Sequence, residues 1–330
     1  MINWVVNGAT VSVGVQRKEI DTRLFRAYLY RRFADHDPDL RGAVGQTIRF
    51  TNYWAPGAPV AGISDVPNLT LRDPVMAARE LTLLTYGEVR EWSSSVVRRS
   101  PAKVERCIRE ELPDSVARSI NLACYTQMAM SNVVYTPTGA IGGETRATVW
   151  NGVVPAGTYS RPLTNWDLAE LQAEAGLLGM KAHPTFKWNL IVEPLNYVQI
   201  LRSMQNFALA GPPKSLEIAL ESWDPGKYVA WLNGVTVWYD NSLDCLSSQR
   251  LGAGGGPFGE ALFFGANPLI EAAVNKGMEI GTETNDTGRK LRLGMYEEDV
   301  GWTLQVNDAG TALARPATAS STCVIRIDGT

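Results

Sequence analysis

Apolar and polar residues alternate along two stretches in the first third of the chain and predict a pair of strands. The stretches cover residues 46–54 and 80–92, and their in-step apolar positions are Ile48, Phe50, Trp54, Leu81, Leu83 and Val89. Over twenty residues rich in proline and glycine separate them, which is an uncommon length for a loop without a function. We therefore predict a two-stranded arm over residues 46–92 with an extended tip.

A lone two-stranded ribbon is only marginally stable in water, so this arm should lie against another surface. A neighbouring subunit is the natural support. The residues expected at that subunit interface are Ile48, Phe50, Tyr53, Trp54, Leu81 and Leu83.

Apolar residues at spacings of three and four predict helices in several other segments. These helices cover residues 17–33, 101–131 with an interruption at Pro113, 167–181 behind a Thr164 cap, a helix that Pro194 opens, and 268–275. In the first helix, one side carries a basic face made of Arg23, Arg26, Arg31 and Arg32. The acidic run at residues 35–39, which contains Pro38, should end that helix.

The remaining apolar stretches predict strands. They cover residues 1–15, 186–192, 228–239, 261–264 and 291–330. Asn233 and Gly234 stand between two alternating runs, and this pair is the strongest short-range signal for a hairpin because both residues tolerate a positive φ. Helices and strands in separate runs indicate the α+β class.

Composition narrows the range of functions. The chain has 330 residues, of which 45% are hydrophobic and 20% charged, so it should fold. Its net charge of −3 argues against a dedicated nucleic-acid binder, which usually carries a basic excess. Ten tryptophans supply much potential contact surface.

The sequence also argues against secretion and membrane insertion. The four cysteines are far apart and form no zinc or disulfide pattern, which fits a reducing compartment. The first residues do not resemble a signal peptide, and no apolar run is long enough to span a membrane.

No motif indicates catalysis, a metal or a cofactor. The glycine-rich stretch at residues 252–257 lacks the Gly-Lys-Ser/Thr ending of a phosphate loop, so a plain loop is favoured. The acidic run at 35–39 could bind a cation, but a solvated turn is the favoured interpretation. Neither His36 nor His183 stands beside a nucleophile motif. We expect no catalytic, cofactor-binding or metal-binding residues.

The order of these segments resembles the major capsid proteins of tailed bacteriophages with the Hong Kong 97-type fold. Residues 45–50 and 81–87 resemble the two strands of that family's extended loop, and residues 101–128 resemble its spine helix. The further matching segments are 163–168, 190–194, 232–237 and 262–265. The resemblance implies an N-arm at 1–45, an extended loop at 46–92, a peripheral domain at 93–185 with 291–330, and an axial domain at 186–290.

The resemblance also implies a function. Such a protein would be a structural component of the virion, would assemble in the host cytoplasm into pentamers and hexamers, and would not be an enzyme. The resulting icosahedral shell would enclose double-stranded DNA, which the basic face would meet without sequence specificity. A scaffolding protein and a portal would take part in assembly, and a decoration protein could bind outside.

Two alternatives stay open at this point. One is an encapsulin-like nanocompartment shell, which has the same fold and encloses enzymes. The other is a hydrolase with an unrecognised site. Some relatives of the phage family join neighbouring subunits through a loop lysine, but residues 46–92 contain neither lysine nor cysteine. The resemblance therefore implies a shell without covalent cross-links at this loop.

Overall fold

The structure is a computed structural model that describes eighteen segments of the chain. They are residues 4–6, 9–11, 29–36, 47–54, 75–100, 107–131, 133–137, 147–149, 163–177, 180–184, 187–205, 230–232, 234–240, 245–246, 260–273, 279–285, 290–305 and 324–328. The chain divides into two compact units. The first unit comprises Met1–Ile48, Leu81–Tyr125 and Glu271–Trp302, and the second comprises Arg49–Glu80, Thr126–Ile270 and Thr303–Thr330.

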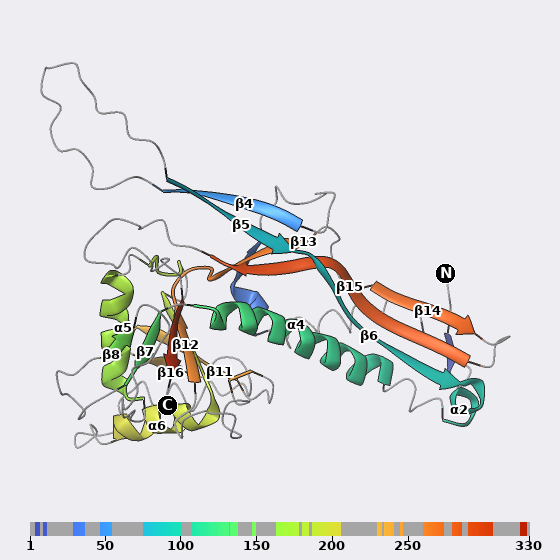
Figure 1. The fold of residues 1–330 in the computed structure, drawn as a ribbon. Coiled ribbons are helices and arrows are strands. Elements are labelled where there is room, and N and C mark those ends of the chain that lie inside the picture. Colours follow the sequence, from blue (N-terminus) through green and yellow to red (C-terminus); the bar gives the residue numbers. More distant parts are fainter. Residues whose placement is uncertain are drawn as a thin grey trace, which may run out of the picture. The chain divides into compact units, whose positions relative to one another are not determined.

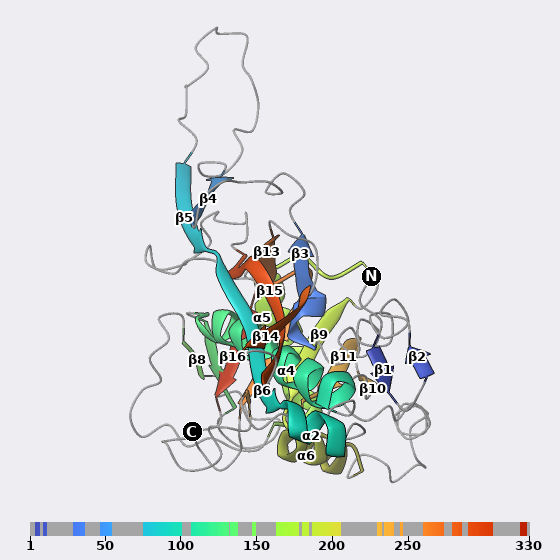
Figure 2. The same cartoon turned by 90° about the vertical axis from the view of Figure 1, so that its right-hand side faces the viewer.

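The first unit is organised along one long strand, β15 (Lys290–Leu304). It pairs antiparallel with β14 (Glu279–Asn285) and with β6 (Leu84–Ser93). Since β14 and β6 bind the same part of β15, they lie on opposite edges of it. β13 (Leu269–Ala273) also pairs with β15 (Figure 1), and β3 (Ala34–His36) pairs with β13 (Figure 2).

A long helix packs against this sheet. A π-helical turn, η3 (Cys107–Glu111), leads directly into α4 (Leu112–Ala129). Pro113 is the second residue of α4 and follows the π-helical turn without a gap, so the helical segment continues through it and changes there from π to α. Cys107 and Leu112 form a buried cluster with Leu293 of β15, and Trp92 of β6 packs on it. The buried positions of α4 include Leu112, Val116, Ile120 and Cys124, as the four-residue spacing predicts.

An α-helix was expected over residues 17–33. The structure describes only residues 29–33 of this range, and they do not form an α-helix. Tyr30–Phe33 form a 3-10 helix, η1, and the chain is already extended in β3, before Pro38. This segment is attached to α4, because the backbone N–H of Leu29 donates to Asn121 Oδ1 at 3.1 Å and the rings of Tyr30 and Tyr125 are 5.7 Å apart.

The predicted two-stranded arm exists, but with a different second strand. β4 (Thr47–Trp54) pairs with β5 (Val75–Thr82), whereas β6 pairs with β15. Leu83 separates β5 from β6. The alternation of apolar residues breaks at the adjacent Leu83 and Leu84: Leu81 and Leu83 are buried, whereas Leu84 and Val89 are exposed, so Val89 is not in step with the two buried leucines. The break coincides with the change of partner, but it does not identify β15 as the new partner. Residues 55–74, the predicted tip, lie outside the described residues. Further upstream, β1 (Trp4–Val6) and β2 (Ala9–Val11) form an antiparallel pair, as the strand pattern predicts.

The second unit contains a mixed sheet of seven strands among its described residues. In spatial order these are β10 (Ala230–Leu232), β11 (Val235–Tyr239), β9 (Trp188–Val192), β12 (Glu260–Phe264), β16 (Val324–Asp328), β7 (Val134–Thr136) and β8 (Ala147–Val149). β9 is parallel to β11, and β16 is parallel to β7. The predicted strands at 186–192 and 261–264 are confirmed, and so is the hairpin, with Gly234 at a φ of 78° in the turn.

Two helices of the second unit begin as the sequence predicts. α5 (Asn165–Leu177) has Thr164 as its cap: Asp167 Oδ2 accepts hydrogen bonds from the backbone N and the Oγ1 of Thr164, both at 2.7 Å. Both donors of Thr164 thus have an acceptor in the first turn of the helix, and the backbone N–H of Asp167 donates to the Thr164 carbonyl at 3.1 Å. α6 (Pro194–Gln205) begins at its proline.

Two sequence-based expectations need correction or qualification. The helix predicted at 268–275 is wrong, because Leu269–Ala273 form strand β13 between β15 and β3. A five-residue apolar run does not distinguish a helix from a buried strand. The proposed peripheral and axial segments also share a sheet, since β16 pairs with β12, the strand next to β9. The domain names therefore stay a prediction.

Candidate functional site

The residues predicted to form the subunit interface fall into two groups. Ile48, Phe50, Tyr53 and Trp54 lie on β4, whose side chains are outside the described part, and their role stays a prediction. Leu81 and Leu83 are 4% and 5% exposed, so they are buried within their own chain. A Cβ at Gly301 would lie 3.1 Å from Leu81 Cδ1, which places Leu81 against β15. We therefore remove both leucines from the predicted interface.

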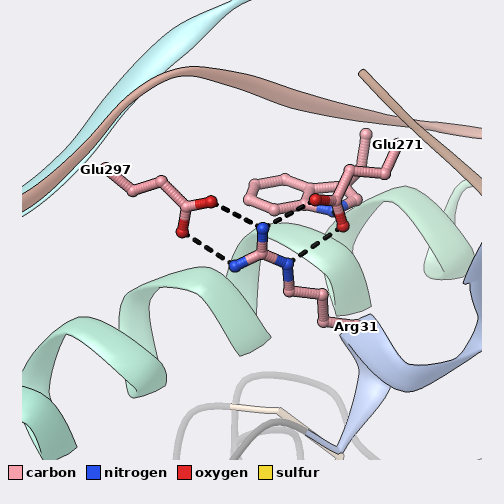
Figure 3. Close-up of polar contacts among 4 residues, drawn as sticks. Arg31, Glu271 and Glu297 are labelled. Carbon is pink, nitrogen blue, oxygen red and sulfur yellow. Dashed lines mark hydrogen bonds and ion pairs between the residues drawn. The ribbon is translucent and has the colours of Figure 1, made fainter. Parts of the chain in front are cut away.

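The four arginines of the predicted basic face do not all face outward in the structure. Arg23 and Arg26 lie outside the described residues. Arg32 is half-buried in η1. Arg31 turns inward, because its only slightly exposed guanidinium binds two carboxylates of the same unit (Figure 3). A phosphate could reach Arg31 only by displacing those carboxylates, so Arg31 is removed from the predicted DNA-facing set.

The Arg31 contacts form a compact buried site, which we call the Arg31 cluster: Arg31, Glu271, Glu297 and Trp302. Arg31 Nε and Nη2 donate to Glu271 Oε2 and Oε1 at 3.0 and 2.6 Å. Its Nη1 and Nη2 donate to Glu297 Oε2 and Oε1 at 2.7 and 2.6 Å. The guanidinium thus makes a two-point contact with each carboxylate, which only the planar fork of arginine can do.

Trp302 completes the cluster. Its Nε1 donates to Glu271 Oε2 at 2.9 Å, and the guanidinium carbon of Arg31 lies 5.6 Å from the centre of its ring. The ring of Tyr86 on β6 meets the indole of Trp302 edge-on, with 5.3 Å between the two ring centres. The cluster therefore attaches the segment around η1 to β13 and β15, and β6 packs against it.

The electrostatics explain why the cluster is stable. The carboxylates of Glu271 and Glu297 are almost completely buried, with side chains 1% and 2% exposed. Burial disfavours the charge of Arg31, but hydrogen bonds to Glu271 and Glu297 outweigh it and raise the pKa of Arg31. Two buried carboxylates that share one cation depend on it, because an unpaired buried charge is costly.

Sequence reasoning missed this cluster because Arg31 is 240 and 266 residues away from its two partners. One signal was present: Glu271 interrupts an apolar run at 269–273, and a carboxylate in a buried strand requires a cation. That signal indicates a partner without identifying it.

A second group of ion pairs lies along β6. Arg90 binds Glu88 Oε1 and Glu111 Oε2, each at 2.7 Å, and its Nη1 lies 3.3 Å from Cys107 Sγ. Glu91, on the exposed face, pairs with Arg292 at 2.7 Å and with Lys290 at 2.8 Å. These pairs join β6 to η3 and to β15, but exposed pairs contribute little to stability.

In the second unit, a tyrosine joins the sheet to α5. The hydroxyl of Tyr135 on β7 lies 2.9 Å from Asp167 Oδ1 and 2.8 Å from Glu170 Oε2. Burial and these carboxylates raise the pKa of Tyr135. The arrangement holds α5 against the sheet.

Several solved structures have a fold similar to that of this chain. The chain is similar to the capsid of Ralstonia phage GP4, with a TM-score of 0.61 and 9% identity over 92% of each chain. It is similar to the capsid of cyanophage Pam1, with a TM-score of 0.58 and 13% identity over 100% of this chain and 96% of that one. The capsid of cyanophage P-SCSP1u gives a TM-score of 0.54 and 11% identity over 98% and 92%.

The chain has the Hong Kong 97-type capsid fold. The resemblance predicted from the order of sequence segments is thus confirmed for this fold. No family model matches the sequence, and no curated protein does either. The Hong Kong 97-type fold is therefore recognisable here from its arrangement of helices and strands.

The remaining candidate chemistry can be located in part. Of the acidic run at 35–39, only Asp35 and His36 are described, on β3. His183 pairs through its backbone with Lys187, and burial lowers the pKa of its imidazole. Over the described segments, no group of three His, Cys, Asp or Glu residues could hold a metal ion. In that same part of the chain, no helix is long and apolar enough to cross a membrane.

Proposed function

We propose that this chain is the major capsid protein of a tailed bacteriophage. Its copies form pentamers and hexamers that close into an icosahedral shell around double-stranded DNA. The observation that carries the proposal is the extent of the fold similarity. It covers 92% to 100% of this chain and 92% to 96% of three phage capsid chains.

The role is structural and not catalytic. A closed shell needs contacts between subunits that repeat by rotation. The two-stranded ribbon β4–β5 is suited to such a contact, because a lone ribbon is only marginally stable and a neighbouring subunit would support it. The apolar residues of β4 would provide that contact, namely Ile48, Phe50, Tyr53 and Trp54. In this role the protein is a component of the virion and assembles in the host cytoplasm.

Further partners follow from the same proposal. Arg23, Arg26 and Arg32 would meet DNA phosphates or a scaffolding protein at the inner surface, through contacts that weaken with salt. A portal would take part in assembly, and a decoration protein could bind outside. Changing the three arginines to glutamine should lower the DNA content of each particle, and an unchanged DNA content would remove this inner-surface role.

Electron microscopy of the purified protein tests the main proposal. Negatively stained samples should contain rings, shells or tubes. Replacing residues 56–74 by a short Gly-Ser turn should abolish these particles and leave unfolding cooperative. A monodisperse monomer of 36.1 kDa at high concentration would overturn the proposal.

A further inference from the structure

We draw no further inference here: the strongest candidate, the cluster of three buried acidic residues that follow β9, follow β11 and begin β12 at one end of the seven-stranded sheet, namely Glu193, Asp240 and Glu260, carries none, because each of them already interacts with other groups of the chain and nothing in the described residues points to a ligand there.

Discussion

Arg31 and Glu271 form a two-point ion pair between η1 and β13, across 240 residues of sequence. The same guanidinium holds Glu297 on β15. Two buried carboxylates therefore share one cation, which attaches the N-terminal part of the first unit to its sheet. The cluster concerns the stability of the subunit, and its removal should be measurable as such.

Arg31→Gln should destabilise the first unit by about 3–5 kcal/mol, the usual cost of leaving buried charges without their partner. Arg31→Lys should recover only part of this loss, because an ammonium cannot make two-point contacts with both carboxylates. Urea unfolding at neutral pH measures the change. Arg99→Gln, at an exposed position of α2 (Ser94–Arg99), is the matched control and should change little.

The Glu88 carboxyl should contribute to acid unfolding. Burial opposes its charge, but hydrogen bonds from Ser115 and Arg90 outweigh burial and lower its pKa below the ordinary 4.5. Because the folded pKa is lowered, its contribution is present above 4.5 and is lost as the pH falls through the folded value. Glu88→Gln should therefore flatten the decline of unfolding free energy below that pH. Glu298→Gln, at an exposed position of β15, should leave the profile unchanged.

Two glycines should respond oppositely to alanine. A Cβ at Gly265 would lie within van der Waals overlap of the Lys181 carbonyl oxygen and 2.9 Å from Trp188, so Gly265→Ala should cost about 1–3 kcal/mol. Gly176 has open space and is helical, so Gly176→Ala should be neutral or stabilise by up to about 1 kcal/mol. Thermal unfolding of both variants checks the difference. Equal effects would mean that space at Gly265 is not limiting.

Mature particles should contain no covalent links through the arm, because residues 46–92 have no lysine or cysteine. Boiling in detergent and reductant should give one band at 36.1 kDa. A ladder of multimers that survives this treatment would contradict the prediction.

The features predicted correctly from sequence depend on neighbouring residues. Gly234 supplies the positive φ of its own turn, and Thr164 is three residues from the Asp167 that completes its cap. The errors concern distant partners. The adjacent Leu83 and Leu84 break the alternation but do not identify β15 as the new partner. Nothing local shows that pairing with β15 makes the 269–273 segment a strand. The pairing of Arg31 with Glu271 and Glu297 likewise exists only after the chain has folded.

The position of β16 has a consequence for the order of events on the ribosome. β16 is the last of the described strands to be synthesised, yet it lies between β12 and β7 in the second unit. Until Val324–Asp328 has emerged, the edges of β12 and β7 that it joins have no partner. A nascent or prematurely terminated chain therefore cannot complete this sheet. In the proposed capsid role, a chain that ends before β16 would lack this sheet and so would not supply a complete subunit to a growing particle.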